Sequence, residues 1–132
     1  MAQTLISNEA FLMQLAQHPN KAQNVYTFQM LPVDAQQEHL DLLQNSLSMI
    51  CTNALCKSTI ILDCSLLKQK SLVKQSCLKK IIGIDNPTGL DKFIIVTTCT
   101  LISVLSKGII KLKRADSYTK ICASIEEAWQ IL

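Results

Sequence analysis

The chain has 132 residues, a length that suits a single domain with a substantial buried core. Hydrophobic residues make up 48% of it and charged residues 17%, a balance that excludes an intrinsically disordered protein. The net charge of +3 comes almost wholly from lysine, with Arg114 as the only arginine. Because nucleic-acid-binding proteins use arginine for phosphate and base contacts, we expect no nucleic acid as a partner.

Residues 1–23 form an N-terminal extension whose pattern fits either a helix or a strand. The stretch "SNEAFLMQLAQHPN" (7–20) is helix-like up to Pro19, whereas "TLIS" (4–7) favours an edge strand. The chain begins without the basic start and long apolar run of a signal peptide, and its longest apolar stretch is too short to span a bilayer. We therefore expect a cytoplasmic protein that does not insert into membranes.

From residue 24 onward, predicted strands and helices alternate. "NVYTFQML" (24–31) predicts a strand that Pro32 ends. Asp34 is then expected to begin a helix, with Gln37 as its capping-box partner. This helix has one apolar face at helical spacing, formed by Leu40, Leu43, Leu47 and Ile50.

Two nearly continuous apolar runs, "STIILDCS" (58–65) and "KFIIVTT" (92–98), predict strands that are buried on both faces. Between them we expect a helix that Ser71 caps and Gly83 ends. A helix at 100–113 and a short strand at 119–122 follow. The last helix carries a capping box, formed by Ser124 and Glu127.

This alternation implies right-handed crossovers and a mainly parallel sheet flanked by helices. The sequence therefore predicts a single small α/β domain with four to five strands in its sheet. The strands at 58–64, 92–97 and 119–122 at least should be parallel.

The closing stretch is similar to that of a known family. "TKI" (119–121), two more residues and then Ser124-x-Glu126-Glu127-Ala128 resemble the final strand and capped helix of STAS domains of the SpoIIAA-like group. Reading backward without gaps, "TCTLISVLSKGIIKLKR" (98–114) is similar to the third helix of that group, and "IILDCSLLKQKS" (60–71) to its central strand and the following loop. The resemblance implies a STAS-like domain over 24–132 that acts as a non-enzymatic regulatory or protein-interaction module.

The resemblance also implies a regulatory loop, for which Asp63, Ser65 and Ser71 are the candidate residues. STAS phospho-switch proteins carry the phosphorylated serine in a turn after the central strand. Here that position falls on Leu72, which has no hydroxyl group, and Ser71 takes the place of the family's aspartate. We therefore expect no phosphorylation switch at this turn and assign Ser71 to helix capping.

No residue pattern predicts catalysis or a cofactor. The six cysteines, at positions 51, 56, 64, 77, 99 and 122, include no Cys-x-x-Cys pair, and His18 and His39 lie far from any cysteine pair. These spacings predict no metal site, and they fit small core residues in a reducing compartment. A disulfide between Cys51 and Cys56 is the alternative. With neither a nucleophile–base pair nor a phosphate-binding glycine loop, we expect no enzymatic activity and no cofactor.

Two other functions remain open. One is a degenerate receiver domain of two-component signalling, because acidic, hydroxyl and lysine residues occur in the order found in receivers. Against it, Asp34 lacks the adjacent acidic residue that helps to hold magnesium in receivers. A β-α unit that receivers have is also missing between Asp34 and Asp63. The residues in question are Asp34, Asp63, Thr97 or Thr98, and Lys120. A small-ligand or lipid-binding module of SEC14-like arrangement is the other. A pocket lined by Leu101, Leu105 and Ile109 would favour it.

The helix at 100–113 is apolar over a wider arc than packing on one sheet requires. Leu101 and Val104 widen its main apolar stripe, and Gly108 would allow another backbone to approach closely. We expect either a helix at 8–18 or a protein partner to cover the surplus, most simply a second copy in a homodimer through helix 100–113. The candidate interaction residues are Ile102, Leu105, Ile109 and Leu112.

Overall fold

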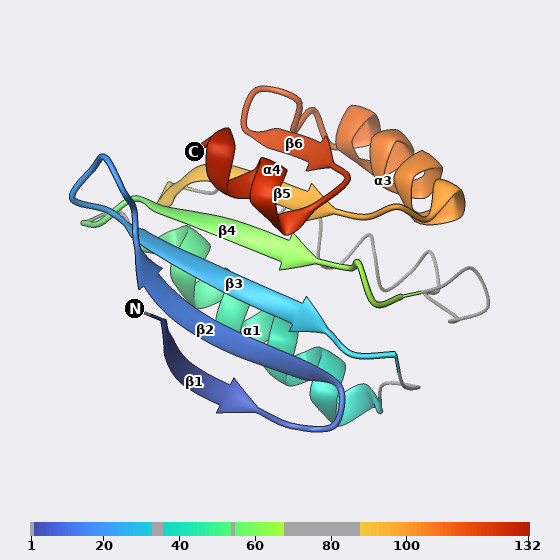
Figure 1. The fold of residues 1–132 in the computed structure, drawn as a ribbon, viewed down its shortest axis with the longest axis horizontal. Helices are drawn as coiled ribbons and strands as arrows, with labels where there is room; N and C mark the ends of the chain where they lie inside the picture. The colour runs from blue at the N-terminus through green and yellow to red at the C-terminus, as the bar shows by residue number, and fades with distance from the viewer. Residues whose placement is uncertain (1, 33–35, 54, 68–87) are drawn as a thin grey trace.

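The computed structural model describes residues 2–32, 36–53, 55–67 and 88–132. Within them, six strands form one mixed sheet in the order β1-β2-β3-β4-β5-β6 (Figure 1). The strands are β1 (Gln3–Ser7), β2 (Phe11–Gln17), β3 (Asn24–Met30), β4 (Ser58–Asp63), β5 (Leu90–Val96) and β6 (Thr119–Cys122). The described helices are α1 (Gln37–Thr52), α3 (Thr100–Leu112) and α4 (Ile125–Gln130).

The strands from β3 to β6 are parallel, which confirms the α/β class and the predicted parallel strands. Strand β4 lies in the middle of this part, and all six of its residues are buried. Ile60 and Ile61 point to opposite faces of the sheet and are both fully buried. Both faces are therefore covered, as the continuous apolar run of this strand predicted.

The prediction of a helix within residues 7–20 is wrong. Phe11–Gln17 form β2, which pairs antiparallel with β1 on one side and β3 on the other, whereas the edge strand predicted at 4–7 is confirmed as β1. Phe11 and Met13 lie in the core at the period of a strand, and their ladder partners Met30 and Phe28 lie beside them. The sheet consequently has six strands instead of the four or five expected.

The turn between β2 and β3 is built around a buried histidine. The Nδ1 atom of His18 accepts hydrogen bonds from the backbone N–H groups of Asn20 and Lys21, at 2.9 and 3.1 Å. The chain thus reverses directly after β2, where the sequence suggested only that a helix ended before Pro19. This turn makes the antiparallel pairing of the two strands possible.

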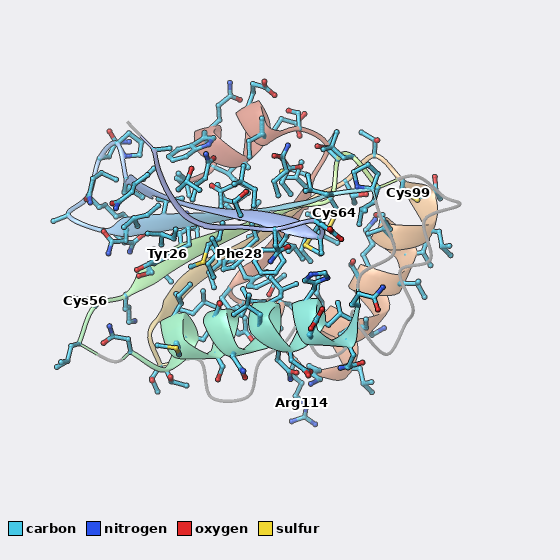
Figure 2. All side chains as sticks on the ribbon, turned by 90° about the horizontal axis from the view of Figure 1, so that it is seen from below. Tyr26, Phe28, Cys56, Cys64, Cys99 and Arg114 are labelled. Carbon is cyan, nitrogen blue, oxygen red and sulfur yellow. The ribbon has the colours of Figure 1, made fainter. Side chains whose placement is uncertain are left out.

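Helices cover both faces of the sheet. Figure 2 shows the sheet edge-on, with α1 beneath it and α4 above it, and with Tyr26 and Phe28 on the α1 side. The larger core cluster joins that side to α1 and α3 and includes Phe28, Leu43, Leu47, Leu62, Phe93, Ile102 and Ile109. The smaller cluster lies under α4 and consists of Val25, Ile61, Ile94, Val96 and Ala128, with Ile125 and Trp129 packed against it.

The helix ends follow the sequence in one case and differ from it in another. The Oγ atom of Ser124 accepts from the N–H of Glu127 at 3.2 Å, which confirms the predicted cap of α4. Helix α1 instead begins at Gln37, with Gln36 as its N-cap residue, whereas Asp34 lies outside the described residues. The backbone N–H of Gln36 donates to Nδ1 of His39 at 3.4 Å, so the histidine takes part in the cap.

Gly89 joins the end of α1 to the start of the parallel sheet. Its N–H donates to the carbonyl of Cys51 at 2.7 Å, and its own carbonyl accepts from the N–H of Ser58 at 2.9 Å. A Cβ atom at this position would lie 2.4 Å from the carbonyl oxygen of Asn53 and 2.8 Å from that of Ile50. The backbone of Gly89 is therefore in direct contact with that of α1, with no room for a side chain.

Candidate functional site

Two of the three candidate regulatory residues lie at the end of β4 and in the loop that follows it. The Asp63 carboxylate is buried, and its Oδ1 atom accepts from the backbone N–H of Ser65 at 3.0 Å. Ser65 itself is exposed. Asp63 therefore shapes the loop by binding its backbone, whereas Ser71 and Leu72 lie outside the described residues.

Three of the buried or half-buried thiols are held in their neutral form. Burial raises the pKa of Cys64 to about 12, and the charge of the adjacent Asp63 raises it as well. Burial also raises the pKa of Cys51 to about 11, and it raises that of Cys122. Because a thiolate is the reactive form, none of these thiols is poised as a nucleophile.

We expect alkylation to distinguish the cysteines sharply. Cys56 is exposed, whereas Cys51 and Cys64 are buried and protonated, so iodoacetamide at pH 8 should modify Cys56 much faster than either. Mass spectrometry of proteolytic peptides over a time course measures the three rates. In guanidinium the rates should converge, and equal rates in the folded protein would contradict the burial of the two thiols.

Helix α3 packs on the sheet through a stripe that differs from the predicted one. Ile102 and Ile109 are buried in the core, Leu105 is half-buried, and Leu112 is 69% exposed. Each residue advances about 100° around a helix, so Leu112, ten positions after Ile102, lies about 80° away from it. Of the four candidate interaction residues, Ile102 and Ile109 are thus packed in the core of this chain, whereas Leu112 is exposed. Ser106 and Ile110 complete the buried side.

The outer face of α3, defined here as Leu101, Val104, Gly108 and Leu112, is an exposed apolar row. Leu101 is 46% exposed and Val104 61% exposed. Gly108 interrupts the row, and a Cβ atom added there would have no neighbour within 4 Å. The surplus of apolar residues expected in this helix therefore faces outward, and of the four candidate interaction residues only Leu112 lies in this row.

The N-terminal segment does not form the predicted helix over this face. Residues 8–18 contain β2, and the sheet order separates β2 from β5 and β6, the two strands that α3 connects. The row of Leu101, Val104 and Leu112 remains exposed in the presence of this segment. The alternative in which residues 8–18 cover α3 as a helix is therefore wrong.

Of the receiver-like residues in the described part of the chain, Lys120 does not converge with Asp63. In the sheet, Asp63 aligns with Val96 and Cys122, whereas Lys120 aligns with Ile94, two residues earlier along β6. Lys120 is thus two strands and two residues away from Asp63. Asp34, the other acidic candidate, lies outside the described residues.

The residues proposed to line a ligand pocket lie in different environments. Leu101 is on the exposed side of α3, Leu105 is half-buried, and Ile109 belongs to the core between helix and sheet. The side chain of Ile109 therefore packs against its core neighbours. The arrangement of these three side chains gives no support to a pocket between them.

Within 2–32, 36–53, 55–67 and 88–132, no group of three or more His, Cys, Asp or Glu side chains could hold a metal ion. None of the helices in these ranges is long and apolar enough to cross a membrane.

The chain was compared with known proteins by sequence family and by structure. No family model matches it, and no match was found among curated proteins or among solved structures.

Proposed function

We propose that this chain is a non-enzymatic regulatory module that binds a protein partner through the outer face of α3. The exposure of Leu101, Val104 and Leu112 in one row is the observation that carries the proposal. Contiguous apolar patches larger than roughly a few hundred Å² are rare on monomeric proteins and commonly mark interaction sites. The opposite, buried side of α3 packs in the core, so the outer row has no packing role within the described fold.

A STAS-like identity is part of this proposal. In its support, the sheet opens with the strand pair β1 and β2 that is usual in the family, followed by the parallel strands β3 to β6. The Asp63 carboxylate shapes the loop after the central strand through the N–H of Ser65. With leucine at position 72 in the family's phospho-acceptor slot, the regulation we propose works through binding and not through a phosphate at that position.

Affinity capture with matched variants tests the proposed function. Val104→Asp and Leu112→Asp place a charge on the outer face of α3 without disturbing the core, because both side chains are exposed. Leu55→Asp is the control, since Leu55 is 95% exposed and lies outside α3. In extracts of the cells that make the protein, we expect partners that wild type and Leu55→Asp retain and both α3 variants lose.

Circular dichroism and thermal unfolding should show that all four proteins are folded. If both α3 variants retain the same proteins as wild type, the outer face of α3 is not the binding surface and the proposed function is wrong.

A further inference from the structure

The shape of the outer face of α3 suits a helix. Its four residues follow one another at spacings of three, four and four, so they form a row along one side of the helix. Helix α3 has 13 residues and is about 20 Å long. Gly108 leaves a depression between Val104 and Leu112, into which a side chain of a second helix would fit.

The charge beside this row has one sign. Lys107 and Lys111 are exposed and lie one turn apart on the Val104 edge of the row. Lys113 and Arg114 follow at the end of the helix and are exposed as well. The stretch from 100 to 114 contains no acidic residue. Within the described part of the chain, the one ion pair is that of Lys21 and Asp91, so the lysines of α3 have no acidic partner there.

From this juxtaposition we propose that the occupant of the outer face is an amphipathic helix of another protein, with apolar residues on one side and acidic residues along their edge. This inference rests on the proposed function and names its partner. The apolar side of that helix packs on Leu101, Val104 and Leu112, over the depression at Gly108. Its acidic edge lies along Lys107 and Lys111, where opposite charges favour the correct orientation.

A second copy of α3 fits this surface poorly. Two such helices would bring eight positive charges and no negative charge into one contact, and antiparallel pairing would place the lysine edges side by side. Helix α1 of a second copy does carry acidic residues, Glu38 and Asp41, beside exposed Leu42 and Met49. Those two apolar side chains stand among polar ones and are too few to cover the row on α3.

An anionic membrane surface is also less suited than a helix. The outer face of α3 contains no tryptophan, tyrosine or phenylalanine, the residues that usually anchor a helix at the membrane interface. Its apolar side chains are two leucines and a valine, and Gly108 interrupts them. A protein helix uses such an interruption for close packing, whereas a lipid surface gains nothing from it.

Two designed peptides test the inference. Both are amphipathic helices about as long as α3 with leucines on one side, and they differ only in carrying glutamates or lysines along the leucine edge. We expect the glutamate peptide to bind about tenfold or more tightly than the lysine peptide at low salt, and this difference to shrink at high salt. Fluorescence anisotropy measures both dissociation constants.

Charge reversal makes the test specific. In the Lys107→Glu/Lys111→Glu double variant, the lysine peptide should become the tighter ligand. Lys120→Glu, on exposed Lys120 of β6, should leave the ranking of the two peptides unchanged, and Val104→Asp should weaken both by about tenfold or more. An unchanged ranking in the double variant would overturn the inference.

The remaining outcomes separate the inference from the proposed function. A dimer in light scattering that Val104→Asp dissolves would identify a second copy as the occupant and overturn the inference. Sedimentation with phosphatidylserine vesicles that depends on Val104, without peptide binding, would overturn it in favour of a membrane. If neither peptide binds while capture from extracts still depends on Val104, only the acidic helix is wrong. If capture of partners from extracts does not depend on Val104, the proposed function is wrong as well.

Discussion

Replacing Gly89 with alanine is expected to destabilise the fold by about 3 kcal/mol or more. The new Cβ atom would lie 2.4 Å from the carbonyl oxygen of Asn53, and backbone atoms cannot move aside as the tip of a flexible side chain can. The clash would also strain the hydrogen bonds from Gly89 to Cys51 and from Ser58 to Gly89. These bonds hold the C-terminal end of α1 against the starts of β4 and β5.

The matched control is the same substitution at Gly108. This glycine lies inside α3, where an added Cβ atom meets nothing within 4 Å, so alanine should raise the free energy of unfolding by about 0.5–1 kcal/mol. Urea unfolding followed by circular dichroism measures both changes. Wild-type stability in Gly89→Ala would show that α1 and the loop before β5 do not approach each other as described.

The contact of Gly89 shows what the sequence leaves out. The stretch "NPTGL" (86–90) predicts a turn from its residue types alone. That this turn meets the end of α1 depends on β5 lying beside β4 in the sheet, and no local pattern contains that information. The turn at Thr88 and Gly89 was therefore predictable, whereas the reason for glycine within it was not, and residues 86 and 87 lie outside the described residues.

The parallel strands were predictable because their signal has one explanation. A run such as "STIILD" (58–63) is apolar on successive residues and too short for a buried helix, so a strand covered on both faces is the consistent interpretation. The apolar residues at 11–17 fit two patterns. Phe11, Met13 and Leu15 alternate as in a strand, whereas Phe11, Leu12, Leu15 and Ala16 lie on one face of a helix. The ladder with β3 decides for the strand, and it is a tertiary effect.

The candidate site was predictable in kind but not in detail. An excess of apolar residues in α3 follows from the sequence, because one sheet needs a stripe of only about 100°. Which of them face outward depends on how the helix is rotated about its axis. In the structure that rotation buries Ser106, and the sequence gives no reason to place a serine in the core. Ile102 and Ile109 were consequently named as candidate interaction residues, although both lie in the core.

Cys64 should make the protein progressively less stable between pH 9 and pH 11. Its pKa in the folded protein is about 12, against 9.0 for an unperturbed thiol, because burial and the charge of Asp63 oppose ionisation. Below pH 9 the thiol is mostly protonated in both the folded and the unfolded protein, so it does not change the free energy of unfolding. Above pH 9 it ionises only on unfolding, so stability falls by up to about 1.4 kcal/mol per pH unit and by about 2–3 kcal/mol at pH 11.

A comparison of variants isolates this effect from the lysines and tyrosines that titrate in the same range. Cys64→Ala should be somewhat less stable than wild type at pH 7, because it loses a buried sulfur atom, yet its stability should fall less steeply above pH 9. Cys56→Ala is the control, since this exposed thiol should leave the slope of wild type unchanged. Urea unfolding at pH 8, 9, 10 and 11, with a reductant present, gives the three curves. Parallel curves for wild type and Cys64→Ala would contradict this prediction. They would mean that the Cys64 thiol ionises as easily in the folded protein as in the unfolded chain, because the loop after β4 admits water to it.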